Sequence, residues 1–185
     1  MYNPELDCNC THLEHEKFNS IIKDEINKVI AIEDIVNKSY CISFDFEHYD
    51  ENANLSAHET LQDLKGKVGV YLLWVNLGHC TEHEMYRMLC LYVGKGFAFQ
   101  RIKSHIKDKW PNSETLYVTF YECENRIAKY IEQLFLDCYD FYLNKEENNG
   151  SGHLETIWNE ERYIMGTELH SLSERLADKF PEQFQ

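Results

Sequence analysis

Hydrophobic residues recur at helical spacing in some parts of the chain and in short β-rich runs in others, and these changes mark the expected elements. From residue 15 to about residue 40, apolar positions recur at helical spacing with charges between them, which predicts an amphipathic helix. The segment 40–46, YCISFDF, predicts a short strand. Residues 50–57 favour a loop. A short helix to Leu64 and a turn at residues 65–67 are expected after it.

The middle of the chain predicts a unit of three strands and two helices. β-rich runs cover residues 68–75 and 88–93, with a polar connection between them, and a third run covers residues 115–121. Helices are expected at 97–109, where Trp110-Pro111 ends the pattern, and at 124–143. This order favours an α+β fold with a small three-stranded antiparallel sheet flanked by helices.

The remaining segments are expected to extend this core. A chain of 185 residues with 43% hydrophobic residues suits one domain with extensions better than two full domains. We expect an acidic N-terminal extension at 1–65, the α+β core at 66–150, and a C-terminal extension at 151–185 with a short helix at 167–179.

Composition narrows the setting in which the protein works. No apolar run reaches the length of a membrane span, and the N-terminal residues lack the basic and apolar stretches of a signal peptide. The seven cysteines are odd in number and scattered, unlike a disulfide framework. We therefore expect reduced thiols, a cytoplasmic location and no association with a membrane.

The charge is unevenly distributed. The formal net charge is −14, which argues at first against a nucleic acid partner. Residues 1–65 hold five Lys and Arg against 14 Asp and Glu, residues 66–150 hold ten against 11, and residues 151–185 hold three against seven. Within the near-neutral middle, the stretch of residues 95–109 is basic and contains a single acidic residue, Asp108. Its cations are Lys95, Arg101, Lys103, Lys107 and Lys109.

Candidate catalytic residues follow one another in a specific order through the core. Gly69-Val70-Tyr71 lies in the first expected strand and Tyr92-Val93-Gly94 in the second, and the two tyrosines are 21 positions apart. Taken singly, such residues have structural explanations: Tyr71 and Tyr92 suit a half-buried sheet. The residues that follow in order are Lys95, Arg101 and His105, then Glu132, then Asn144 just past the second helix.

This ordered set resembles the GIY-YIG nuclease superfamily over residues 66–150. The resemblance implies a β-β-α-β-α core and a phosphodiester-cleaving site built from Tyr71, Tyr92, Arg101, Glu132 and Asn144. It also implies that Glu132 binds a single divalent metal ion. The tyrosines are farther apart than is usual in the family, and an insertion around residues 76–86 accounts for the difference.

Phosphodiester hydrolysis requires an activated water molecule, neutralised phosphoryl oxygens and a stabilised leaving oxygen. Tyr71 is the expected base or water-orienting group, with Tyr92 and Lys95 assisting. Arg101 offers a planar fork for a phosphate, and His105 lies one turn further along the same helix face. His105 is either catalytic or a phosphate contact.

Glu132 is expected on a largely apolar helix side, where a carboxylate needs a partner. Lys129 or Arg126 of the same helix could be that partner through an ion pair. The alternative partner is Mg²⁺ or Mn²⁺, bound by this one carboxylate, by waters and by the substrate phosphate. Structural zinc is less favoured because the spacing of the remaining candidate ligands fits no familiar zinc motif. Those candidates are Cys8, Cys10, His12, His15, His79, Cys80 and His83.

The sequence therefore predicts a metal-dependent endonuclease with substrate contacts along the basic stretch from Lys95 to Lys109, and DNA is favoured over RNA as its substrate. The alternative is a catalytically silent module that keeps the fold and binds nucleic acid or an acidic protein through that stretch. A basic protein partner would suit the acidic flanks at 1–65 and 151–185.

Overall fold

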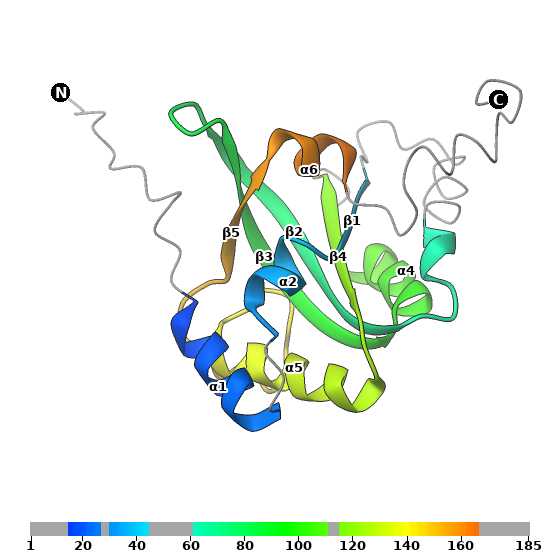
Figure 1. Cartoon of the computed structure of the whole chain (residues 1–185). Helices are drawn as coiled ribbons and strands as arrows, with labels where there is room; N and C mark the ends of the chain where they lie inside the picture. Colours follow the sequence, from blue (N-terminus) through cyan, green and yellow to red (C-terminus); the bar gives the residue numbers. More distant parts are fainter. Residues whose placement is uncertain (1–14, 27–29, 45–60, 111–114, 167–185) are drawn as a thin grey trace, which may run out of the picture.

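The computed structural model describes residues 15–26, 30–44, 61–110 and 115–166 (Figure 1). Its antiparallel sheet has five strands in the order β1-β4-β2-β3-β5. The strands are β1 (Tyr40–Phe44), β2 (Val68–Cys80), β3 (Met85–Phe97), β4 (Leu116–Glu122) and β5 (Glu155–Asn159). The helices are α1 (Glu16–Ile26), α2 (Ile32–Val36), the 3-10 helix η2 (Leu61–Leu64), α4 (Ala98–Lys109), α5 (Asn125–Cys138) and α6 (Glu160–Met165).

The α+β class is confirmed, but the expected three-stranded sheet is wrong in its strand number. The expected strands are β2, β3 and β4, and β1 and β5 extend the sheet on either side. β1 pairs antiparallel with β4, and β5 pairs with the outer part of β3. β5 lies in the expected C-terminal extension, where the sequence predicts no strand because five residues, ETIWN, are too few to show a clear alternation.

Opposite faces of the sheet carry separate hydrophobic clusters, because side chains alternate along each strand. Val70, Leu72 and Trp74 of β2 belong to a cluster with α1, α2 and α5. Tyr71 and Leu73 belong to a second cluster with η2 and α4. Figure 1 shows α4 and α5 on opposite sides of the sheet, so β2 lies between the two helices that carry the candidate residues.

The β2–β3 hairpin is longer than expected and contains two irregularities. Both strands run through the segment expected as a polar connection, so that only residues 81–84 join them. Leu73 pairs with Tyr92 and Trp74 with Cys90, which leaves Leu91 as an extra residue of β3. Leu77 is the corresponding extra residue of β2. Each strand thus holds one bulge, and the inserted residues lengthen both strands.

The N-terminal segment forms two helices where one was expected. α1 ends at Ile26 and α2 begins at Ile32, with residues 27–29 outside the described part. The Asn19 side chain accepts a hydrogen bond of 2.8 Å from the Ile32 amide, and the Asp34 carboxylate accepts one from the Ala31 amide. These side chains satisfy amides at the start of α2, where a helix lacks internal acceptors. The loop expected at 50–57 and the helix expected at 167–179 lie outside the described residues.

Helix α5 ends at Cys138, earlier than the predicted residue 143. Tyr139 has extended backbone angles (φ −129°, ψ 156°), so the chain leaves the helix there and forms a loop before β5. The Asn148 side chain holds this loop, because it accepts from the Phe141 amide and donates to the Phe141 carbonyl and the Asp140 carboxylate. Asn144 therefore lies within an ordered loop and not directly after the helix.

Helix α6 connects the two edges of the sheet. It follows β5 at one edge, and its buried Arg162 donates hydrogen bonds to the Ser39 and Val36 carbonyls beside β1 at the other edge. Arg162 also lies over the Trp158 ring, 5.0 Å from its centroid. Figure 1 shows α6 crossing above the sheet from β5 towards β1. No helix of the described residues is long and apolar enough to cross a membrane.

Helix α1 packs against α5 and belongs to the same core. Phe18 is 1% exposed, and its ring lies 4.7 Å from that of Phe135. We predict that Phe18→Ala lowers the free energy of unfolding by about 3–5 kcal/mol, because it opens a cavity beneath α5. Phe97→Ala is the control, since Phe97 is 59% exposed, and it should change stability by less than about 1 kcal/mol. Urea unfolding of both variants measures the difference. Equal losses of stability in the two variants would show that α1 is not part of the core.

Candidate active site

The register of the β2–β3 hairpin brings the two tyrosine triplets together. Tyr71 pairs with Gly94, and Leu73 pairs with Tyr92, so both tyrosines project from the α4 face. Their ring centroids lie 6.0 Å apart with an interplanar angle of 28°. The separation of 21 positions in the sequence does not separate them in space, because the added residues extend the hairpin away from this end.

The glycine of each triplet is required by a close approach of another group. A Cβ atom at Gly94 would lie 2.5 Å from the Cζ and hydroxyl oxygen of Tyr71. A Cβ atom at Gly69 would lie 2.0 Å from the Tyr121 carbonyl oxygen of β4. Real Cβ atoms do not approach so closely, which means that Gly94 provides the space for the Tyr71 side chain and Gly69 lets β2 approach β4.

His105 completes a cluster with the two tyrosines. Helix α4 carries it on the face that packs against the sheet, where its Nε2 lies 3.0 Å from the Tyr71 hydroxyl. Its ring centroid lies 4.4 Å from that of Tyr92. Burial, and then the positive charges of Lys109 and Arg101, lower the pKa of His105 to about 4. The imidazole is therefore neutral at pH 7.

Burial is the main influence on the pKa of both tyrosines. It raises the pKa of Tyr71 well above its usual value, and a hydrogen bond with Tyr92 raises it further. Burial also raises the pKa of Tyr92, whereas the hydrogen bond from Tyr71 and the charge of Arg101 oppose that rise. Tyr71 is fully buried, and Tyr92 is 8% exposed. The protein by itself therefore keeps Tyr71 protonated at neutral pH.

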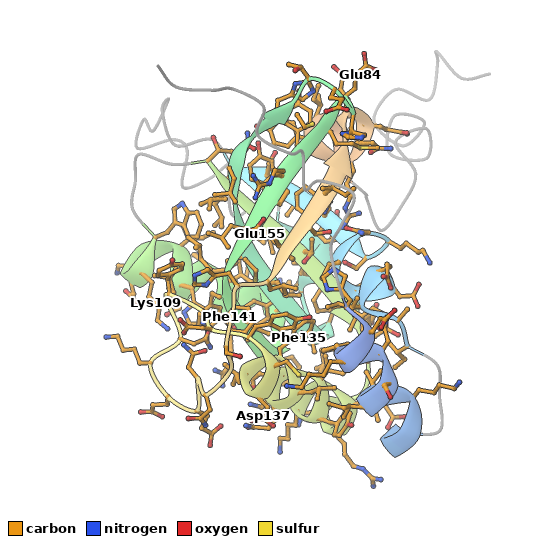
Figure 2. All side chains as sticks on the ribbon, turned by 90° about the vertical axis from the view of Figure 1, so that its left-hand side faces the viewer. Glu84, Lys109, Phe135, Asp137, Phe141 and Glu155 are labelled. Carbon is orange, nitrogen blue, oxygen red and sulfur yellow. The ribbon has the colours of Figure 1, made fainter. Side chains whose placement is uncertain are left out.

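Glu132 of α5 and Lys95 of β3 form an ion pair on the other side of the sheet's end. The Glu132 side chain is only 14% exposed, so this partner satisfies a largely buried carboxylate. The two partners expected from the helix itself, Lys129 and Arg126, are replaced by a residue of the neighbouring strand. Figure 2 shows the orientation of α5, with Phe135 directed into the protein and Asp137 directed outward.

Asn144 fixes the loop after α5 to strand β3. Its Oδ1 accepts from the Val93 amide at 3.0 Å, and its Nδ2 donates to the Val93 carbonyl at 2.9 Å. The neighbouring Leu143 amide donates to the carbonyl of the bulge residue Leu91. The loop thus pairs with β3 where β5 has ended, and the second tyrosine triplet is held from outside the sheet.

A pocket of about 330 Å³ opens where these elements meet. Figure 2 shows Lys109, at the end of α4, beside the loop that follows α5. The Lys109 ammonium lies over the Tyr92 ring, 4.5 Å from its centroid. The residues that line the pocket are Tyr92, Lys95, Lys109, Glu132, Leu136, Asn144, Lys145, Glu146 and Glu147.

The structure brings most, but not all, of the expected residues to this place. Arg101 is exposed on α4 and is not among the residues that line the pocket, but its charge acts on both tyrosines and on His105. Lys103 and Lys107 lie on the exposed face of α4 and do not line the pocket. Lys145, Glu146 and Glu147 line it but were not expected there. In the sequence they look like an ordinary polar loop, and only their position directly after Asn144 could have indicated them.

The candidate zinc ligands do not converge within the described part of the chain. Cys8, Cys10 and His12 lie outside it, and His15 Nδ1 lies 3.3 Å from the Tyr139 hydroxyl. At the hairpin tip, Cys80 Sγ lies 3.5 Å from His83 Nδ1, whereas His79 packs against Tyr86. Among the described residues, no group of three or more His, Cys, Asp or Glu side chains is arranged to hold a metal ion.

The chain was compared with models of protein families, with curated proteins and with solved structures, and none of these matches it. The resemblance to the GIY-YIG nucleases therefore rests on the order of the residues in the sequence, and membership of the family stays a prediction.

The low pKa of His105 can be tested directly. We predict that NMR titration finds its imidazole neutral at pH 6 and protonated only near pH 4. Because the folded pKa lies below the ordinary value of 6.5, the contribution of this group to stability is complete above pH 6.5 and is lost as the pH falls towards 4. Lys109→Gln should raise this pKa by removing a nearby positive charge, whereas Lys103→Gln on the same helix should leave it unchanged. A pKa near the ordinary value of 6.5 for His105 in the unaltered protein would show that this imidazole is not buried as described.

Proposed function

We propose that the protein is a metal-dependent endonuclease that hydrolyses phosphodiester bonds, with DNA as the favoured substrate. The observation that carries this proposal is the convergence at one end of the sheet of Tyr71, Tyr92, His105, Glu132 and Asn144. They come from two strands, two helices and a loop. The hairpin register brings the two tyrosines together despite the long insertion, and His105 lies beside Tyr71. Glu132 and Asn144 line one pocket with Tyr92. A stability role for each side chain alone would not require this convergence.

Glu132 suits a divalent cation. Its carboxylate supplies the hard oxygen ligand that Mg²⁺ and Mn²⁺ prefer, and it faces a pocket of about 330 Å³ that has space for several waters and a phosphate oxygen. Such an ion would polarise a phosphoryl oxygen and stabilise the leaving oxygen. Lys95 neutralises Glu132 in the protein alone and becomes available for a phosphate oxygen once that carboxylate has another cationic partner.

Arg101 and Lys109 suit the negative charge of the substrate. Arg101 is exposed beside the tyrosines, and its planar guanidinium can donate two hydrogen bonds to one phosphate. Lys109 lines the pocket over Tyr92. These cations would stabilise the charge that develops on the phosphoryl oxygens during attack by water. Asn144 does not need to touch the substrate, because its two hydrogen bonds to Val93 maintain the shape of the site.

The first test concerns the metal ligand. We predict that Glu132→Gln lowers cleavage by at least about a hundredfold, because it removes a charged oxygen ligand while keeping the side-chain shape. The matched control is Glu124→Gln at the exposed start of the same helix, which should cleave like the unaltered protein. The assay uses supercoiled plasmid, linear duplex, single-stranded DNA and RNA, each with Mg²⁺, Mn²⁺ or EDTA.

Binding of the same nucleic acids in EDTA, followed by fluorescence anisotropy, should be nearly unchanged in Glu132→Gln. Cleavage by this variant at the rate of the control would show that Glu132 is not part of the catalytic site. Binding by the unaltered protein without any cleavage would favour the alternative of a silent binding module.

The second test concerns phosphate binding. We predict that Arg101→Ala lowers both kcat and substrate affinity, because its contact exists in the bound substrate and strengthens as charge develops in the transition state. Arg126→Ala is the control, since Arg126 is exposed near the start of α5 and is not among the charges that act on the two tyrosines and His105. Steady-state kinetics on a labelled oligonucleotide separate the two effects. Equal kinetics for both variants would place Arg101 outside the site.

A further inference from the structure

The loop that follows α5 carries an exposed tyrosine two residues before Asn144. Tyr142 is 63% exposed, whereas its neighbour Phe141 is fully buried. Exposure of one aromatic side chain is ordinary on a protein surface. This ring, however, is held in one position by His153, which lies 11 residues further along the chain.

His153 contacts both the ring and the hydroxyl of Tyr142. The two ring centroids lie 4.9 Å apart with an interplanar angle of 23°, and the hydroxyl oxygen lies 3.2 Å from His153 Nε2. His153 Nδ1 lies 3.4 Å from the Asp140 carbonyl oxygen, which can only accept. Nδ1 therefore carries the proton of the neutral imidazole, and Nε2 accepts from the Tyr142 hydroxyl. The imidazole covers one face of the tyrosine ring, and the other face is open to solvent.

Contacts between the two ends of the loop bring these residues together. The Asp140 amide donates to the Gly152 carbonyl at 2.9 Å. A Cβ atom at Gly150 would lie 2.1 Å from the Tyr139 amide nitrogen, so only a glycine lets the two ends approach so closely. The open face of Tyr142 is therefore preformed, and a ligand that stacks on it does not have to order the side chain first.

The same loop lines the pocket of the candidate active site. Asn144 and Lys145 are lining residues, whereas Tyr142 lies outside the lining. Two residues of extended chain span at most about 7 Å, so the backbone of Tyr142 lies within that distance of Asn144. Lys145 is exposed and supplies a positive charge, and Glu146 and Glu147 supply negative charges after it. The first part of the loop thus offers an aromatic ring and a cation, and the carboxylates follow them.

A nucleobase fits the open face of Tyr142. Proteins that hold single strands combine cations for the phosphates with aromatic rings on which the bases stack. A base within a duplex is covered by its neighbours, so it must leave the helix before it can stack on a protein side chain. An unpaired base does not meet this cost. The ring and the cation of the loop therefore favour an unpaired nucleotide over a paired one.

We propose that Tyr142, supported by His153, is a stacking platform for an unpaired nucleobase beside the phosphate in the pocket. The inference rests on the proposed nuclease function and narrows its substrate to nucleic acid with an unpaired nucleotide next to the cut. Lys145 would contact the phosphate that joins the stacked nucleotide to the one in the pocket. Tyr142 and His153 do not belong to the ordered set of residues on which the family resemblance rests.

Binding to single-stranded DNA in EDTA, followed by fluorescence anisotropy, tests the platform without cleavage. Tyr142→Leu should weaken this binding by about fivefold to a hundredfold, the range for the loss of one stacked base, and should leave the affinity for a fully paired duplex unchanged. Tyr142→Phe keeps the ring and should bind as the unaltered protein does. Ile164→Ala is the control, because it removes another exposed apolar side chain from α6, which Figure 1 shows at the opposite end of the sheet from α5.

An oligonucleotide that contains 2-aminopurine reports the stacking itself, because the emission of this adenine analogue falls when it stacks. Its emission should fall when it binds the unaltered protein or Tyr142→Phe, and should fall less when it binds Tyr142→Leu. Equal affinity and equal emission for Tyr142→Leu and Tyr142→Phe would overturn the proposal. A loss of affinity in Tyr142→Leu that is equal for single strand and duplex would also overturn it, because it would assign Tyr142 to the maintenance of the loop.

Cleavage with Mg²⁺ separates this inference from the proposed function. An active nuclease should cut a duplex with a single-stranded extension faster than a fully paired duplex, and Tyr142→Leu should reduce that preference. Equal cleavage of both substrates by the unaltered protein rejects the platform and keeps the nuclease function. Stacking of 2-aminopurine on Tyr142 without any cleavage supports the platform and rejects only the nuclease function.

Discussion

The candidate site depends on the contact between Tyr71 and Gly94 across the β2–β3 hairpin. Tyr71 can occupy its buried position only because its partner residue has no side chain, since a Cβ atom at Gly94 would lie 2.5 Å from the tyrosine ring. This contact fixes the register of the hairpin at one end. A shift by one residue between β2 and β3 would place the two tyrosines on opposite faces of the sheet, so that only one of them could contact His105. The tyrosine–histidine cluster therefore exists only in this register.

Two parts of the structure hold that register from outside the hairpin. β4 approaches β2 so closely that Gly69 must lack a side chain. On the other side, Asn144 hydrogen-bonds both backbone groups of Val93, and the carbonyl of the bulge residue Leu91 accepts from the amide of the preceding loop residue, Leu143. The bulge therefore has two effects. It returns Cys90 to the α5 face, and it provides an acceptor that positions the loop around the pocket.

The sequence predicted the parts of the fold whose signal is local. The β-rich run of residues 68–75 predicted β2, and the apolar face of α5 predicted its burial against the sheet. The bulge at Leu91 was not predictable, because nothing in its own identity distinguishes it from its neighbours in β3. The resemblance also assigned Asn144 to the architecture of the site, but it did not indicate the contact, because Asn144 hydrogen-bonds the backbone of Val93, which is 51 residues away in sequence. Trp158 is buried in β5 for a similar reason, since its indole donates to the distant Val36 carbonyl.

Helix α6 has a consequence for how the sheet opens. An open sheet normally loses its edge strands first, each independently of the other, because an edge has pairing on one side only. Here Arg162 joins the chain that follows β5 to the carbonyls that precede β1, and Gly166 passes so close to the Cys41 carbonyl that a Cβ atom there would lie 2.4 Å from it. Fraying of one edge therefore breaks hydrogen bonds at the other. These contacts link the two ends of the strand order, although the hydrogen-bonded ladder of the sheet stays open.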